Sequence, residues 1–279
     1  MILTNLITMA GNGKRFNEEG YQLPKPLIEV DGEPMIYRVI DSLPASEKWI
    51  FVVRQEHIEE YNIDKILKNK MPGAIIETDK DLMGGASIFC AEKYLEPDED
   101  VLIAGCDNGV VFNKDRFEEL KDEKYGCILW TFTRDPRISD SPESWGYAAL
   151  ARDDKTIEDI SVKVPVSADP YEDHAVTAIF HIRSAELLYK AIRLMVQKEI
   201  KTKGEFYLDN IPIVLSQLGE KSIIFDVDLY VGWGTPKELH EFEKILHHYK
   251  FSSLERAGLT REQTKLWKRY FGDVHVFKN

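Results

Sequence analysis

A loop near the amino terminus carries the residues with the clearest capacity for chemistry. Gly11 and Gly13 follow an apolar run, and the adjacent cations Lys14 and Arg15 come after them. Glycine lets a backbone approach a ligand closely and turn its N–H groups toward that ligand. Arg15 and also Lys25, which stands between two prolines, can neutralise phosphate oxygens. The segment therefore predicts a triphosphate site at the end of the first strand of an α/β sheet, where such sheets bind ligands.

Two other kinds of glycine loop fit this segment less well. A dinucleotide-binding loop needs a third small residue where this chain has Phe16. A Walker loop has four residues between its glycines and Ser or Thr after its lysine, whereas one residue separates Gly11 from Gly13 and Arg15 follows Lys14. The plain alternative is a tight turn from a strand into a loop, with solvated cations.

The loop and the Pro-Lys-Pro-Leu segment at residues 24–27 resemble the sugar-phosphate nucleotidyltransferase family, the nucleoside-diphosphate-sugar pyrophosphorylases. The resemblance implies a Rossmann-like α/β fold, a Mg²⁺ ion, and transfer of a nucleotidyl group from a nucleoside triphosphate to a phosphorylated acceptor. It makes Arg15 and Lys25 the catalytic residues: Arg15 would stabilise the departing pyrophosphate, and Lys25 would contact the α-phosphate or the acceptor phosphate. The nucleotide-binding residues that it implies are Ala10, Gly11, Asn12, Gly13, Lys14, Gly84, Gly85 and Ala86.

The elements that must position these residues follow the pattern of an α/β protein. Short apolar runs alternate with amphipathic ones, which predicts a mostly parallel sheet flanked by helices. We expect strands at residues 3–9, 49–53, 74–77, 101–104 and 126–133, and helices at residues 35–43, 57–67, 85–94 and 117–120.

The pattern of apolar and polar residues changes after residue 133. Strand-like segments at residues 147–151, 157–164 and 175–182 predict a smaller antiparallel insertion that forms the acceptor side of the cleft. Helices at 185–196, 206–218 and 236–248 and a last strand at 223–231 complete the expected elements. We expect one nucleotidyltransferase domain, 1–250, with its nucleotide-binding part at about 1–133 and its acceptor-binding part at about 134–250. Residues 251–279 are expected to form a helical tail that serves packing or contact in a homo-oligomer.

Asp107 is the candidate magnesium ligand. It follows the buried strand predicted at 101–104, and a carboxylate at that end of a strand faces the ligand crevice of an α/β sheet. Mg²⁺ prefers such oxygen ligands together with phosphates and water. The segment resembles the family's Gly-Asp-Asn segment, whose aspartate holds the metal. The alternative is a turn, because Asn108-Gly109 is a good turn dipeptide.

Three residues in the second half are assigned to the acceptor by the resemblance. Gly146 would leave room for the acceptor ring, Lys163 would contact the acceptor phosphate, and Glu205 would bind acceptor hydroxyl groups. The lysine segment departs from the family's Glu-Lys-Pro, because Val162 replaces the glutamate and Val164 precedes the proline. The alternative for Lys163 is an ordinary surface lysine, and the alternative for Glu205 is a glutamate that stabilises a helix amino terminus.

The largest departure from the family's sequence pattern lies at Gly232. Many relatives have Asp-x-Gly-Thr-Pro there, and their aspartate helps to hold the metal, so a second carboxylate must come from elsewhere or be absent. Asp226 and Asp228 share one face of the predicted last strand. We expect Asp228 to serve, because it is nearer the strand's carboxyl end; the alternative is that both residues face solvent.

Composition excludes several other classes of protein. The net charge of −12 argues against binding of nucleic acid or of an anionic membrane, and no apolar stretch has membrane-spanning length. Cys90, Cys106 and Cys127 are odd in number and lack metal-ligand spacing, which favours a reduced, cytoplasmic setting.

The expected reaction is nucleotide transfer to a sugar phosphate with release of pyrophosphate. Two alternatives stay open. The acceptor could be a non-sugar molecule, such as a phosphocholine-like compound or a phospho-amino acid, as in a cytidylyltransferase. The loss of a metal carboxylate at Gly232 would also suit a non-catalytic nucleotide-sensing subunit.

Overall fold

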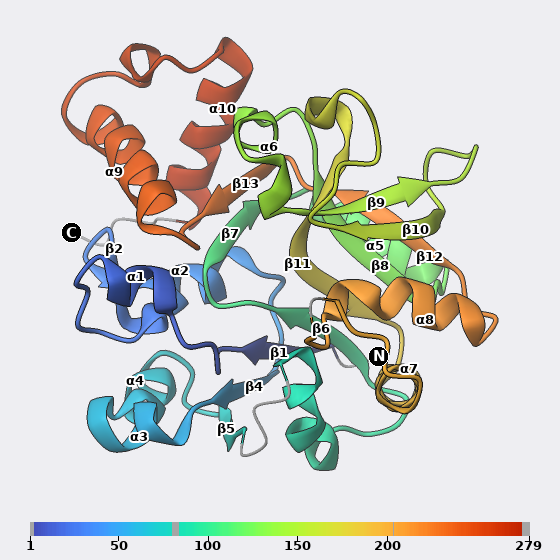
Figure 1. Cartoon of the computed structure of the whole chain (residues 1–279). Coiled ribbons are helices and arrows are strands. Elements are labelled where there is room, and N and C mark those ends of the chain that lie inside the picture. Colours follow the sequence, from blue (N-terminus) through green and yellow to red (C-terminus); the bar gives the residue numbers. More distant parts are fainter. Residues whose placement is uncertain (1–2, 80–83, 203, 275–279) are drawn as a thin grey trace. The chain divides into compact units, whose positions relative to one another are not determined.

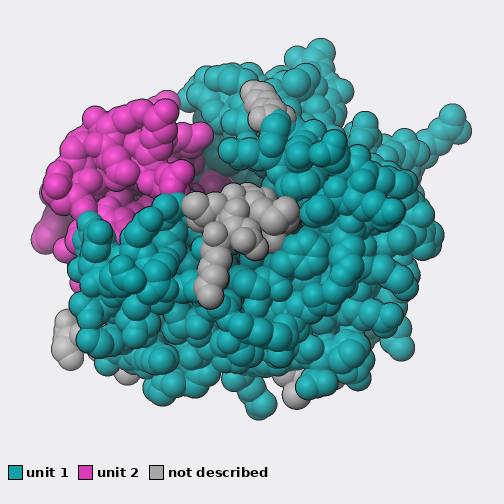
Figure 2. Space-filling view, turned by 60° about the horizontal axis from the view of Figure 1, so that its bottom comes forward, with its two compact units in different colours: residues 1–11, 46–105, 114–226 teal, residues 12–45, 106–113, 227–279 magenta. Residues whose placement is uncertain are grey.

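The computed structural model describes residues 3–79, 84–202 and 204–274. The chain divides into two compact units, each built from separate segments (Figure 2). Unit 1 comprises residues 1–11, 46–105 and 114–226, and unit 2 comprises residues 12–45, 106–113 and 227–279.

The first half of the sheet in unit 1 is parallel (Figure 1). Its strands run in the order β6 (Asp100–Ala104), β1 (Leu3–Thr8), β4 (Lys48–Val53) and β5 (Ile75–Thr78). Residues 49–53 of β4 are all buried, which is typical of a parallel strand covered on both faces. The expected helix at 57–67 is two helices, α3 (Gln55–Tyr61) and α4 (Ile63–Lys70), because Asn62 adopts a left-handed conformation between them.

The antiparallel strands extend the same sheet. The strand β11 (His174–Ile182) pairs antiparallel with β6, β8 (Cys127–Phe132) and β9 (Gly146–Leu150). The strand β10 (Ile157–Val162) pairs antiparallel with β9, and β12 (Ser222–Asp226) pairs parallel with β8. The predicted class, an α/β fold with a helix-flanked sheet and antiparallel strands, is confirmed. The remaining helices of unit 1 are α5 (Lys114–Asp122), α6 (Pro136–Asp140), α7 (Ala185–Gln197) and α8 (Ile211–Gln217).

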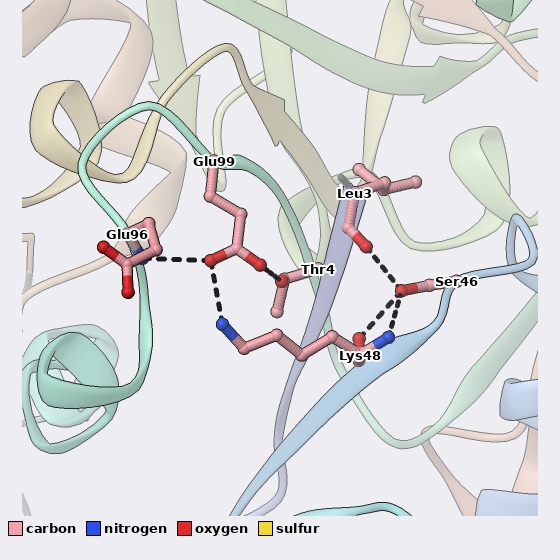
Figure 3. Close-up of polar contacts among 6 residues, drawn as sticks. All are labelled: Leu3, Thr4, Ser46, Lys48, Glu96 and Glu99. Atoms are coloured by element: carbon pink, nitrogen blue, oxygen red, sulfur yellow. Dashed lines mark hydrogen bonds and ion pairs between the residues drawn. The ribbon is translucent and has the colours of Figure 1, made fainter. Parts of the chain in front are cut away.

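The amino ends of three parallel strands are tied together by Glu99 (Figure 3). Its carboxylate accepts hydrogen bonds from the Thr4 hydroxyl, from Lys48 Nζ at 2.8 Å and from the backbone N–H of Glu96 at 3.0 Å. Burial raises the pKa of Glu99, but these donors stabilise the carboxylate and leave the pKa below its usual value. A fully satisfied buried carboxylate therefore closes the end of the sheet opposite to the Thr8 end of β1.

Unit 2 is built around a two-stranded antiparallel ribbon of β7 (Asn108–Val111) and β13 (Leu229–Gly232). The predicted last strand at 223–231 was wrong as a single element, because β12 ends at Asp226 and β13 begins at Leu229 in the other unit. The two aspartates therefore do not share one strand face. The other elements of unit 2 include α1 (Lys14–Glu18), the short strands β2 (Glu29–Val30) and β3 (Glu33–Pro34), α2 (Met35–Ser42), α9 (Pro236–Phe251) and α10 (Arg261–Arg269).

The segment after α9 contributes to the core of unit 2. Tyr270 and Phe271 are fully buried, and Trp267 lies 6.0 Å from Phe242 of α9 between ring centroids. Arg269 donates to the backbone carbonyl of Phe112 at 2.8 Å, next to β7. Among the described residues, no helix combines the length and the apolar character needed to cross a membrane.

Candidate functional site

The glycine loop leads from β1 into α1. Gly13 adopts a left-handed conformation with φ of 60°, and its carbonyl accepts from the N–H groups of Phe16 at 3.0 Å and Asn17 at 3.2 Å. A Cβ added at Gly13 would lie 3.5 Å from Cβ of Lys25, so this glycine both permits the turn and contacts the Pro-Lys-Pro-Leu segment. Phe16 is buried and anchors α1, whereas Arg15 is exposed.

Lys25 and Asp107 form an ion pair within unit 2. Lys25 begins the 3-10 turn η1 (Lys25–Leu27), and Asp107 directly precedes β7. Burial is the largest single influence and lowers the pKa of Lys25, but the charges of Asp107 and Cys106 and the hydrogen bond to Asp107 together leave the pKa raised; the cation of Arg15 opposes this. The structure thus brings together Lys25 and Asp107, which the sequence assigned to phosphate and to metal.

The end of the ribbon adds a residue that the sequence did not predict. The N–H of Trp233 donates to the carbonyl of Asp107 at 2.8 Å, which holds the start of α9 beside this aspartate. A Cβ added at Gly234 would lie 3.0 Å from Oδ2 of Asp107 and 3.2 Å from Oε2 of Glu238. The Thr-Pro-x-Glu start of α9 was the available signal for Glu238, but it indicates only a helix cap.

Asp228 lies elsewhere in unit 2. Its N–H donates to the carbonyl of Val111, and its carboxylate pairs with Arg269 at 2.9 Å. In the ribbon Gly232 pairs with Asn108 and Leu229 with Val111, so Asp228 is at the other end from Asp107. At ~3.3 Å per residue, five residues separate the two carboxylates by roughly 16 Å of strand. The structure does not bring these two candidate metal ligands together.

Asp226, the other carboxylate considered for the metal, belongs to unit 1. Its Oδ1 accepts from the Thr131 hydroxyl at 2.7 Å and lies 2.9 Å from Nδ1 of His174. Burial raises the pKa of Asp226, but His174 and Thr131 stabilise the carboxylate and leave the pKa lowered. This aspartate therefore links β12 to β8 and β11.

Two of the three candidate acceptor residues, Gly146 and Lys163, lie near the half-buried carboxylate of Asp209 in unit 1. A Cβ added at Gly146 would lie 2.8 Å from Oδ2 of Asp209, so only glycine fits beside this aspartate. Burial raises the pKa of Asp209 to about 6, and the charge of Lys163 lowers it, which places the lysine within electrostatic reach. Lys163 itself has φ of 66°, a strained conformation, and its N–H donates to the carbonyl of Trp145 at 2.8 Å. Glu205 is exposed, and its backbone pairs with Thr202.

Asp209 was also absent from the sequence prediction. The only sequence feature that pointed to Asp209 was its place in the first turn of the short 3-10 helix η5 (Leu208–Asn210), which follows Glu205. Gly84, Gly85 and Ala86 begin the 3-10 helix η2 (Gly84–Tyr94); the residues before them lie outside the described ranges, and their nucleotide contacts stay a prediction. Burial and then the charge of Asp107 raise the pKa of the neighbouring Cys106 thiol to about 12, which disfavours the nucleophilic thiolate.

Known proteins resemble this chain in sequence and in fold. Residues 5–129 match the MobA-like NTP transferase domain. The bifunctional protein GlmU of Thermotoga sp. (strain RQ2) is 24% identical over 266 residues, which cover 91% of this chain and 54% of that protein. The chain therefore spans about half the length of this curated relative.

Solved structures share the fold. The nucleoside-diphosphate-sugar pyrophosphorylase from Vibrio cholerae RC9 superposes with a TM-score of 0.70 at 19% identity, over 85% of this chain and 98% of that one. The inositol-1-phosphate CTP transferase from T. maritima gives a TM-score of 0.64 at 16% identity, over 96% of each chain. The match of residues 5–129 to the MobA-like NTP transferase domain, together with the shared fold, confirms the resemblance to the sugar-phosphate nucleotidyltransferases that the opening loop predicted.

Proposed function

We propose that this protein transfers a nucleotidyl group from a nucleoside triphosphate to a phosphorylated sugar and releases pyrophosphate. The Lys25–Asp107 ion pair carries the proposal, because it sets a cation for phosphate and a carboxylate for metal beside the left-handed Gly13. The nucleotide would lie against residues 10–14 and 84–86.

The chemistry needs no general base. An oxygen of the acceptor phosphate, already ionised near neutral pH, attacks the α-phosphorus in line, and the bond from that phosphorus to the pyrophosphate oxygen breaks. Catalysis then consists of positioning and neutralisation of charge. Lys25 would hold the α-phosphate or the acceptor phosphate, and Arg15 would stabilise the charge that collects on pyrophosphate.

The residues present fit a magnesium ion. Asp107 offers a hard oxygen ligand, and a Cβ-sized space beside Gly234 adjoins that oxygen at 3.0 Å. When bound, Mg²⁺ would neutralise phosphate charge and polarise the phosphoryl group. Asp107 would hold it, and Lys25 would pass from this carboxylate to a phosphate oxygen.

The acceptor would be bound in unit 1 by Gly146, Lys163 and Glu205, with Asp209 between the first two. A second candidate acceptor is a non-sugar phosphate. The strained Lys163 and its altered segment favour this candidate, and one structural neighbour is named as an inositol-1-phosphate CTP transferase.

A matrix of acceptors and nucleotides tests the proposal. CTP, UTP, dTTP, GTP and ATP would each be combined with sugar 1-phosphates, inositol 1-phosphate, phosphocholine and phosphoserine, and pyrophosphate release would be measured with and without Mg²⁺. We expect one pair to dominate and to require Mg²⁺. Tight nucleotide binding without release from any acceptor would contradict catalysis and favour the sensing subunit.

A further inference from the structure

We infer that Glu238 supplies the second carboxylate of the magnesium site, in place of the aspartate that relatives carry where this chain has Gly232. The inference rests on the proposed function, because it adds a ligand to the metal that nucleotide transfer would use. It concerns residues of unit 2 alone.

The start of α9 aims this glutamate at Asp107. The N–H of Glu238 donates to Oγ1 of Thr235 at 3.2 Å, and the same hydroxyl contacts Oε2 of the glutamate at 3.1 Å. These contacts fold the side chain back over the first turn, toward the glycine that precedes Thr235. The carboxylate is thereby held at the ribbon end, where Trp233 binds the backbone of Asp107.

Gly234 marks the point on which both carboxylates converge. Oδ2 of Asp107 and Oε2 of Glu238 lie 3.0 and 3.2 Å from the position of an added Cβ, so they are at most about 6 Å apart. Two oxygens that share a magnesium ion with bonds of ~2.1 Å lie within ~4 Å of each other, so rotation of the glutamate side chain would let both carboxylates bind one ion. The backbone of Gly234 is not left-handed, so glycine is needed here for space rather than for conformation.

The charges at this point favour a divalent cation. Two carboxylates this close repel each other, and Lys25, which pairs with Asp107, offsets one of the two negative charges. Among the described residues, no set of three or more His, Cys, Asp or Glu side chains could hold a metal. The ion would therefore complete its shell with phosphate oxygens and water, so phosphate should strengthen its binding.

Glu238 is better placed for this role than Asp228. The Asp228 carboxylate is held by Arg269 at the far end of the ribbon. The Glu238 carboxylate instead lies near Gly234, next to Asp107. The position is also close in sequence to Gly232, so the start of α9 can compensate for the missing aspartate.

Binding of Mn²⁺ tests the inference without any assay of activity. Free Mn²⁺ would be followed by electron paramagnetic resonance in titrations of the full chain, with and without inorganic pyrophosphate, the product common to all such transfers. We expect pyrophosphate to tighten Mn²⁺ binding to the wild type. Glu238→Gln keeps the shape and the contact to Thr235, and should weaken this binding at least about tenfold, as should Asp107→Asn.

A second variant removes the space instead of the charge. Gly234→Ala places a methyl group where the carboxylates converge and should also weaken Mn²⁺ binding about tenfold or more. Gly73→Ala, which adds a methyl group in open space, and Glu241→Gln, on the same helix, are the matched controls and should bind as the wild type does. Circular dichroism would verify that each variant is folded.

The outcomes separate the inference from the proposed function. Weak binding in Asp107→Asn with wild-type binding in Glu238→Gln and Gly234→Ala would overturn the role of Glu238 and leave the function standing. If the folded wild type bound no Mn²⁺ with pyrophosphate present, both would fall.

Discussion

Two lysine–carboxylate pairs, one in each unit, show how differently the same chemistry can be used. In unit 1 the Glu99 carboxylate is 5% exposed and takes hydrogen bonds from Lys48, Thr4 and a backbone N–H. In unit 2 the Asp107 carboxylate is 29% exposed, pairs with Lys25, and faces a second carboxylate across Gly234. The first pair is satisfied from within the fold, whereas the second leaves room for a cation and a phosphate to enter.

The difference follows from the place of each pair along the sheet and the ribbon. Glu99 precedes β6 and sits at the amino ends of strands, where buried donors meet it. Asp107 follows β6 and precedes β7, in the kind of position where α/β proteins bind ligands. A buried ion pair with all its hydrogen bonds made holds strands together. The Lys25–Asp107 pair is partly exposed and has the carboxylate of Glu238 nearby, so one lysine faces two negative charges.

Loss of the Asp107 charge should give the largest effect. Asp107→Asn is expected to abolish Mg²⁺-dependent turnover, lowering kcat/KM by about 10³-fold or more, since metal-assisted charge neutralisation contributes several kcal/mol. Pyrophosphate release at varied Mg²⁺ measures it. An unchanged rate with normal magnesium dependence would make the pair structural, like that of Glu99.

Removal of either candidate catalytic cation should come next. Lys25→Ala and Arg15→Ala should each lower kcat/KM by about 10²–10³-fold, or 2.7–4 kcal/mol, by analogy with the loss of one oxyanion donor. Lys237→Ala, an exposed lysine on α9, controls for the loss of surface charge. Rates within threefold of the wild type for both variants would exclude these cations from the mechanism.

The pair in unit 1 should respond in stability instead. Glu99→Ala leaves Lys48 and Thr4 without their partner and should lower the free energy of unfolding by about 3 kcal/mol. Urea unfolding at neutral pH measures this loss, and kcat/KM of the folded protein should stay unchanged. Glu96→Ala is the control, because Glu96 contributes its backbone N–H rather than its side chain. If Glu99→Ala lowered kcat/KM without lowering the free energy of unfolding, the Glu99–Lys48 pair would have a role in activity rather than in stability.

Asp209 offers a third carboxylate near a lysine, and its pKa shift is opposite in sign to that of Glu99. Its pKa of about 6 lies above the ordinary value of 3.8, because burial favours the neutral acid. The folded protein therefore binds one more proton than the unfolded chain between about pH 4 and 6, so stability falls as pH rises through this window, by roughly 2–3 kcal/mol. The unfolding free energy of Asp209→Asn minus that of the wild type should grow accordingly from pH 4 to pH 7. A constant difference would contradict burial of this carboxyl group.

The exposed pair of Asp228 and Arg269 should give the smallest effect. Asp228→Asn should change the free energy of unfolding by less than about 1 kcal/mol, because partly exposed ion pairs contribute little. Mn²⁺ binding with pyrophosphate should match that of the wild type. Weakened Mn²⁺ binding would restore the assignment of Asp228 to the metal.

Local sequence was enough for the residues whose role depends on their immediate neighbours. Gly13 needs a left-handed backbone, Lys25 stands between prolines, and Asp107 follows an apolar strand, so each could be singled out without a partner. The alternation of apolar and amphipathic runs likewise predicted the parallel strands and the helices that cover them.

Tertiary structure decided where distant segments meet. The break between β12 and β13 follows from pairing of β13 with β7, which no pattern within residues 223–231 reveals. The same pairing carries Glu238 to Asp107, and η5 packs against β10 and β11 and carries Asp209 to Gly146. A helix-capping glutamate and a half-buried aspartate look ordinary in sequence, because local patterns encode the conformation of a segment, whereas the chemistry of a carboxylate depends on the charges that the fold places around it.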